Sequence, residues 1–321
     1  MTRRGRIARA SILLVPAAGF LLLSGGRSAH AEAAGAFPNL EPWPETLALG
    51  GIPVALGEGV EAVLENPTGM LTNGGNGIAF SHASLFTGGL VKHQTFAVCY
   101  ARKDEQISWT NGTIYQGHGA VSSAIGIGVT NLSGDLPGSD SYGELQFSLA
   151  YARRVPLGMK AGFRIRGLQA RTTVNEMGGA GGYAFDFGLE NRILGCRVGF
   201  VANAVASEVR WDRSIDAPIP TRFAVSFERD AGHGLTTLAG IEMRSSAQLK
   251  RVTFAARWLF PGTPLALQAG PSLLSGDGES HAEISAGTTI RVGGLAAEYG
   301  MRTGPSGLGE IHRFGIRVAL P

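Results

Sequence analysis

Residues Gly182-Tyr-Ala-Phe-Asp-Phe-Gly-Leu-Glu190 alternate between two kinds of side chain. The odd positions hold Tyr, Phe, Phe and Leu, whereas the even positions hold only Gly, Ala, Asp and Glu. Because successive side chains of a strand point to opposite faces, this stretch predicts a strand with one large apolar face and one small or acidic face. A helix would scatter the same residues around its surface.

The same alternation recurs along most of the chain, between turns rich in Gly, Pro, Asn and Asp, and it predicts about fourteen strands. We place them near residues 77–86, 90–102, 118–131, 142–154, 159–171, 182–191, 194–206, 220–229, 235–245, 250–260, 263–271, 281–292, 295–303 and 309–320. No apolar run after the N-terminus reaches the roughly 20 residues that a spanning helix needs. We therefore expect an all-β protein.

The predicted strands all have one apolar face and one charged face. One face carries large apolar residues, among them Phe147, Leu149, Phe227, Phe254, Trp258, Tyr299, Phe314 and Ile316. The other carries charges of both signs: Arg164, Arg166, Asp186, Glu190, Arg197, Arg222, Glu228, Glu242, Arg244, Arg251, Arg257, Glu283, Arg291, Glu298, Arg302, Arg313 and Arg317. In a soluble sandwich the apolar faces of two sheets would meet, whereas in a transmembrane barrel the apolar face would contact lipid and the charged face would line the lumen. Alternation alone leaves both architectures open.

The lengths of the connections separate these alternatives. If the first strand runs outward from the periplasm, the connections near Pro156, Arg192, Ala231, 261–264 and 293–294 lie in the periplasm and are short. Those near 131–141, 172–181, 205–219, 271–280 and 304–308 lie outside and are longer. This difference is typical of outer-membrane barrels. One connection on the periplasmic side, 103–117, is long and holds either further strand residues or an insertion. On the external side, the glycine-rich stretch 178–182 is expected to be a flexible part of a loop.

The N-terminus predicts export. Residues 1–31 combine a run of arginines, an apolar stretch and a small-x-small site at Ala29-His-Ala31, as a secretory signal peptide does. The net charge of +3 depends on this region, because five of the 28 basic residues precede Glu32 and leave 23 against 25 acidic residues. A nucleic-acid partner is therefore not expected.

The two cysteines, Cys99 and Cys196, fall on opposite strand faces and are expected to be free and buried.

A second pattern lies before the strands. Residues Leu47-Ala-Leu-Gly-Gly51, then Val54-Ala-Leu56, then Glu61-Ala-Val-x-x-Asn66-Pro67-x-Gly69 are followed by Phe80–Phe86. Val60, Val63 and Leu64 have helical spacing, and Pro67 is expected to end that helix. This order resembles the N-terminal signature of the PorV/PorQ-like outer-membrane proteins, which are similar to FadL-type transporters of long-chain fatty acids.

The resemblance implies a transmembrane antiparallel β-barrel of about fourteen strands with a short N-terminal helical hatch. The expected organisation is a signal peptide over 1–31, a lead and hatch segment over 32–75 with Asn66, Pro67 and Gly69, and the barrel over 76–321. It implies an integral protein of the bacterial outer membrane that takes part in protein secretion, of the type IX kind, or in outer-membrane assembly. The alternative is a FadL-like channel for hydrophobic solutes such as long-chain fatty acids.

The sequence shows no site of catalysis. It has no metalloprotease, nucleophile-elbow or phosphate-loop motif, and its seven histidines lack metal-ligand spacing. Ser81 and His82 are neighbours on a strand and should point to opposite faces, so we expect no enzyme, metal or cofactor. The lumen residues Arg164, Arg166, Asp186, Glu190, Arg197, Arg222, Glu228, Glu242, Arg257 and Glu298 form either a structural network of ion pairs, which their mixed signs favour, or a selective anion pore. Expected partners are outer-membrane lipid, secretion-system or cargo proteins, and a hydrophobic small molecule.

Overall fold

The computed structural model describes residues 40–72, 75–85, 91–110, 113–135, 141–173, 178–212, 219–245, 250–276, 279–303 and 310–320. The predicted signal peptide and its cleavage site at Ala31 lie outside these ranges, and so do residues 32–39 of the predicted lead and hatch segment. Within the described ranges, no helix is both long enough and apolar enough to span a membrane.

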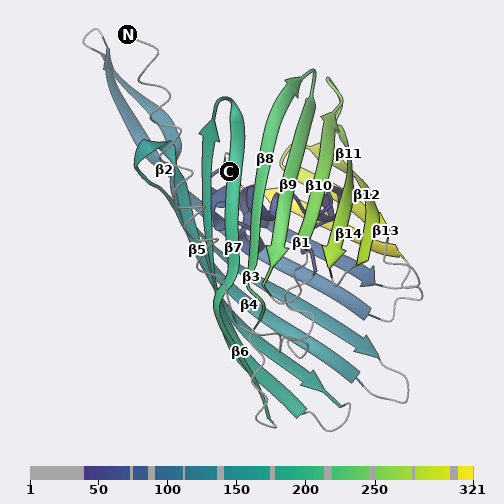
Figure 1. Ribbon diagram of the computed structural model, residues 1–321. Helices are drawn as coiled ribbons and strands as arrows, with labels where there is room; N and C mark the ends of the chain where they lie inside the picture. The colour runs from purple at the N-terminus through teal and green to yellow at the C-terminus, as the bar shows by residue number, and fades with distance from the viewer. Residues whose placement is uncertain are drawn as a thin grey trace, which may run out of the picture.

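Antiparallel strands form a closed barrel in which β1 pairs with both β2 and β14 (Figure 1). The fourteen strands of the described residues are β1 (Gly77–Leu85), β2 (Val91–Thr110), β3 (Thr113–Asp135), β4 (Ser141–Arg154), β5 (Lys160–Thr172), β6 (Gly178–Ile193), β7 (Cys196–Trp211), β8 (Arg222–Gly232), β9 (Leu235–Arg244), β10 (Lys250–Leu259), β11 (Leu265–Gly276), β12 (Glu279–Val292), β13 (Leu295–Thr303) and β14 (Glu310–Ala319). The predicted fold class is thereby confirmed.

The two faces of the strands differ as the alternation predicts. In β6, Phe185 is 39% exposed on the outside, whereas the neighbouring Asp186 is 2% exposed on the inside. Ser81 is buried on the inner face of β1, while His82 belongs to the outer face. Large apolar side chains also form lateral rows on the outside, since Tyr100 is level with Ile125 and Ile125 with Tyr151. The barrel is therefore apolar outside and polar or small inside.

Strands β6 and β7 are longer than predicted, so the expectation of a flexible external loop over Gly178–Gly182 is wrong. These glycines pair with β5 on one side, and from Ala180 the strand also pairs with β7. A Cβ on Gly182 would lie 2.1 Å from the carbonyl oxygen of Glu208 on β7. Glycine is thus required here by the close approach of the neighbouring strand, rather than by a turn.

The long connection 103–117 is extra strand, the first of the two predicted alternatives. Strands β2 and β3 continue as a two-stranded hairpin as far as Thr110 and Thr113. A register shift between Arg102 and Glu105 marks the point where the hairpin leaves the barrel wall. Beyond this point neither strand pairs with β1 or β4, and the hairpin projects from the end of the barrel that carries the short turns (Figure 1).

Residues 40–72, which precede β1, lie inside the barrel (Figure 1). Residues 40–72, which we call the lumen segment, form α2 (Pro44–Ala48), α3 (Pro53–Leu56) and the 3-10 helices η1 (Gly59–Leu64) and η2 (Pro67–Leu71). Proline at the first turn suits three of these helices, because its fixed φ fits a helix start and its missing N–H has no partner there. The predicted helix around Val60 is present as η1 and ends before Pro67.

Both cysteines are free, as predicted. Cys99 is 3% exposed and belongs to the inner face of β2. Cys196 begins β7 and is only partly buried, so the expectation that both thiols are buried is wrong for this residue. Cys196 lies on the outer face of β7, as its parity predicts, and side chains on that face are not enclosed by the barrel.

Candidate ligand site in the barrel lumen

Hydrogen bonds of the Asn66 side chain link the Asn66-Pro67 turn both to the lumen segment and to the barrel wall. The Asn66 side chain donates to the carbonyl oxygen of Ala55 at 2.7 Å and to that of Phe200, on the barrel wall, at 3.3 Å. Its Oδ1 accepts the backbone N–H of Thr68 at 3.2 Å, the N-cap bond of η2, and the Thr68 hydroxyl at 2.8 Å. Asn66 is fully buried. This turn therefore joins the lumen segment to itself and to the wall.

Glycines provide the space for this turn. A Cβ on Gly69 would lie 1.7 Å from the carbonyl oxygen of Gly57, within the segment. On the wall, a Cβ on Gly188 would lie 2.0 Å from Asn66 Oδ1, and one on Gly162 would lie 2.8 Å from Pro67 Cβ. The three residues singled out from the sequence, Asn66, Pro67 and Gly69, all lie at such close contacts.

An apolar contact holds the other side of the segment. Val60, Val63 and Leu64 are buried against small inner-face residues of β1 to β4, including Ala97, Ala124 and Ala150. Added Cβ atoms at Gly126 and Gly128 would lie 2.3 Å from Val63 and 2.6 Å from Leu64. The inner-face side chains of the wall are small on this side of the barrel, which leaves room for η1 to pack against it.

The glutamates of the segment bind arginines of the wall. Glu41 lies 2.9 Å from Arg251 and 2.7 Å from Arg302, Glu45 2.5 Å from Arg257, Glu58 2.7 Å from Arg197, and Glu61 3.1 Å from Arg317. Burial opposes ionisation of Glu41, but the guanidinium groups of Arg302 and Arg251 hold its pKa well below the usual range. Glu61 differs, because burial and the nearby Glu298 and Glu45 outweigh Arg317 and raise its pKa.

The ten lumen residues predicted from the sequence form ion pairs in several groups. Asp186 binds Arg164 at 2.6 Å and Arg166 at 2.8 Å. Arg197 binds Glu190 at 2.9 Å and lies 3.6 Å from Glu228. The remaining contacts are Arg222 with Glu242 at 2.5 Å, Arg257 with Glu228 at 3.8 Å, and Arg317 with Glu298 at 3.0 Å. These are the contacts expected of a structural network.

Sequence reasoning missed the partners that the segment supplies. Residues 40–72 contain five glutamates and no lysine or arginine, which is the signal that could have revealed them. Glu45, Glu61 and Glu298 lie so close together that one oxygen of each falls within 4.8 Å of the others. Arg317 is ion-paired to two members of this group and Arg257 to the third, so arginines supply its countercharge.

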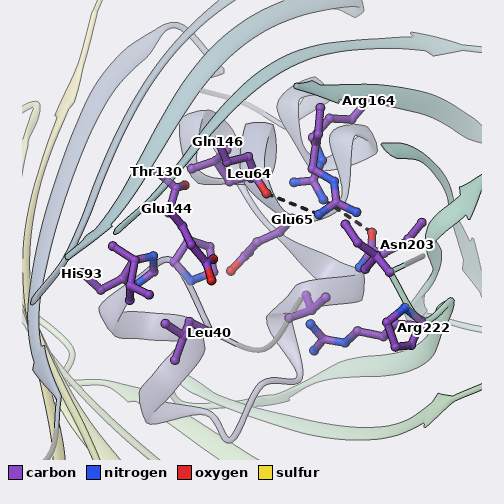
Figure 2. Close-up of a pocket in the computed structure, with 17 residues that line it drawn as sticks. Leu40, Leu64, Glu65, His93, Thr130, Glu144, Gln146, Arg164, Asn203 and Arg222 are labelled. Carbon is purple, nitrogen blue, oxygen red and sulfur yellow. Dashed lines mark hydrogen bonds between the residues drawn. The ribbon is translucent and has the colours of Figure 1, made fainter. Parts of the chain in front are cut away.

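A cavity of about 70 Å³ lies between the segment and the wall. Apolar lining comes from Leu40, Val54, Leu64, Leu132 and Ile219. Figure 2 shows Glu65 directed into this cavity, with His93 and Glu144 on one side and Arg164 and Arg222 on the other. Glu65 also lines a second, smaller cavity, together with Glu45, Glu61 and Arg257.

Glu65 stands apart from the other glutamates of the segment. It is 2% exposed, and the hydroxyl of Thr46 donates a hydrogen bond to it. Among the described residues no arginine forms an ion pair with it. Burial therefore raises the pKa of Glu65 to about 8, although Thr46, Arg164 and Arg222 act in the opposite direction. The raised pKa favours the neutral form of this carboxyl at neutral pH.

No family model and no curated protein matches this sequence. Solved structures do share its fold. The CymD monoaromatic hydrocarbon channel aligns over 86% of this chain and 97% of its own, with 10% identity and a TM-score of 0.61. The toluene transporter TbuX of Ralstonia pickettii aligns over 88% and 100%, with 11% identity and a TM-score of 0.57. A Pseudomonas aeruginosa FadL homologue aligns over 86% and 98%, with 9% identity and a TM-score of 0.51. The chain thus shares the barrel fold of these three proteins.

Proposed function

We propose that this protein is an outer-membrane channel for small hydrophobic solutes and that the lumen segment is its gate. The observation that carries this proposal is a closed barrel whose interior is occupied by a folded segment, with a cavity between that segment and the wall. The comparisons, whose similar structures are named as channels and transporters, favour this alternative over the secretion role that the PorV/PorQ resemblance implies.

The outer surface supports a place in the membrane. Large apolar side chains are exposed around the barrel, for example Phe147 at 53%, Phe254 at 61% and Ile316 at 54%. Such a surface is costly in water and suits lipid. The short turns mark the periplasmic end, by the rule for outer-membrane barrels. Export by the predicted signal peptide over 1–31 belongs to the same proposal.

The segment has the features of a gate that can open. It is joined to the wall by ion pairs, by hydrogen bonds and by apolar contacts around Val63, Ile52 and Val54. Apolar side chains line one part of the cavity of about 70 Å³, and a solute that covered them would gain about 25 cal/mol for each Å² buried. Binding there would compete with the packing of Leu64 against the wall.

Whole-cell uptake tests this function. The protein is produced in a Gram-negative host that lacks its own channel for hydrophobic solutes, and initial uptake of labelled toluene, labelled oleate and labelled glucose is measured. We expect faster uptake of a hydrophobic solute and unchanged uptake of glucose. Correctly inserted protein that accelerates neither hydrophobic solute would refute the proposal, whereas a defect in protein release in the native organism on deletion would support the secretion role.

A further inference from the structure

Four exposed basic side chains lie together at the base of the β2–β3 hairpin. They are Arg102 and Lys103 on β2, and Arg153 and Arg154 on β4. Unlike most of the lumen arginines, none of them forms an ion pair with a carboxylate among the described residues. Arg154 is held to the wall, since its Nε donates to the carbonyl oxygen of Val121 at 2.6 Å.

Two of these side chains belong to the outer face. Arg102 follows Tyr100 by two positions and Arg153 follows Tyr151 by two, and both tyrosines are outward-facing. Arg102 and Arg153 are both register partners of Ser123 on β3. Because neighbouring strands are about 4.8 Å apart, the two arginines start about 10 Å from each other across one strand, within reach of a shared group.

Apolar side chains lie directly beside this pair. Tyr100, Ile125 and Tyr151 form the adjacent lateral row toward the middle of the barrel, and Tyr100 is 64% exposed. Aromatic rows of this kind mark the boundary between lipid tails and head groups. The arginines therefore lie at the level of the head groups, on the end with the short turns.

We propose that Arg102 and Arg153 bind the phosphate of an anionic phospholipid of the periplasmic leaflet, whose acyl chains cover Tyr100, Ile125 and Tyr151. Guanidinium groups match phosphate geometry through paired N–H donors, and basic clusters at this depth attract anionic lipid. This inference rests on the proposed function only for the place of the barrel in the outer membrane.

The site also explains where the barrel wall ends. The register of β2 and β3 shifts between Arg102 and Glu105, and beyond this shift the hairpin has no neighbouring strand. A lipid head group bound at Arg102 and Arg153 fixes the membrane surface at the base of the hairpin. The hairpin then stands clear of the membrane, in the periplasm.

Native mass spectrometry of the purified barrel in mild detergent tests this site. The wild type, Arg102→Gln/Arg153→Gln and the matched control Lys92→Gln/Arg171→Gln are titrated with phosphatidylglycerol and with phosphatidylcholine. The control removes two outward-facing cations at the opposite end of the barrel. We expect the test variant to bind phosphatidylglycerol roughly one order of magnitude more weakly than the wild type, because each basic side chain near the head groups strengthens binding several-fold. The control should bind like the wild type.

Equal phosphatidylglycerol binding by the wild type and the test variant would overturn the proposal, and so would an equal loss in the control. Displacement of the lipid by inorganic phosphate at the same concentration would show a site for a free anion and would also overturn it. Gel mobility before and after heating confirms that each variant is folded. Solute uptake by the test variant is measured in parallel, so that failure of the channel function and failure of the lipid site give different results.

Discussion

At the scale of single residues, Glu65 is the group whose ionisation should change the stability of the barrel. Its pKa is about 8 in the folded protein, against an ordinary value of 4.5. A raised pKa means that stability is greatest below pH 4.5 and is lost as the pH rises to about 8. Over that range the unfolded chain releases a proton that the folded chain retains.

Glu65→Gln should remove this loss. We expect the unfolding midpoint in urea, followed by heat-modifiable gel mobility at pH 5, 7 and 9, to fall with pH in the wild type and to change less in the variant. The difference at pH 9 should be on the order of a few kcal/mol. Glu310→Gln, which changes an exposed glutamate, is the control. Parallel curves for the wild type and Glu65→Gln would contradict the buried, protonated carboxyl.

Asn66 should determine how firmly the segment is held. Asn66→Ala removes two donated hydrogen bonds and the N-cap of η2. We expect a loss of about 1–3 kcal/mol, and faster uptake of hydrophobic solute because the closed state is weakened. Thr68→Ala removes only the hydroxyl bond to Asn66 and should have a smaller effect on both readouts. A larger effect of Thr68→Ala would show that the turn is not centred on Asn66.

At the scale of the elements, β6 tests the assignment of the two faces. Phe185→Arg places a charge on the outer face and should cost roughly 2–4 kcal/mol near the middle of the bilayer. Phe185→Leu is the control that keeps the face apolar. Folding yield into lipid vesicles, measured by heat-modifiable mobility, compares them. Equal yields of the two variants would mean that Phe185 does not face lipid.

Strand alternation predicted the barrel because each strand has one environment outside and another inside. The 182–190 stretch carries this signal in full. Alternation gives no signal at Gly178–Gly182, because these residues have no large side chains. There the strand is defined only by its pairing with β5 and β7. Alternation fails also at 103–117, because a hairpin that leaves the wall no longer has an inside and an outside.

The short helices of the lumen segment were only partly predictable. The spacing of Val60, Val63 and Leu64 indicated η1, but α2 and α3 are too short to show helical periodicity. Their positions depend on the wall, for example on the close approach of Pro44 to Gly300 and of Leu49 to Gly270. Contacts of this kind are set by residues more than 200 positions away, which no local pattern contains.

At the scale of the whole molecule, the segment and the wall have complementary charge. The seventeen charged residues that alternation assigns to the inner face comprise eleven arginines and six acids, and the segment carries five glutamates. The sequence predicted the charged inner face but not its partner, because the five glutamates precede the strands. The wall alone would hold eleven arginines against six acids, and buried charge without a countercharge is unfavourable. The segment is therefore part of the folded barrel rather than an appendage.

This complementarity predicts the behaviour of a barrel without its segment. Deletion of residues 32–71 should give an open pore with an excess of arginine in the lumen. In planar bilayers under a KCl gradient, we expect the wild type to conduct little and the deletion variant to conduct with a reversal potential that indicates anion selectivity. Replacement of Glu41, Glu45, Glu58 and Glu61 by Gln is a second way to unbalance the lumen. Cation selectivity in the deletion variant would contradict the charge assignment.

The central claim is that the lumen segment must move for a hydrophobic solute to pass, and a disulfide that fixes the segment tests it most directly. An added Cβ at Gly128 would lie 3.0 Å from Cγ of Leu64, so the pair Leu64→Cys/Gly128→Cys can join the segment to β3 by a disulfide. Cys99 and Cys196 are replaced by Ala, and each single cysteine variant is the control. Uptake of the labelled solute is measured in the same cells under oxidising conditions and again after reduction. We expect uptake to stop when the disulfide forms and to return on reduction, while the single variants do not respond. Undiminished uptake through the fully oxidised barrel would contradict the claim.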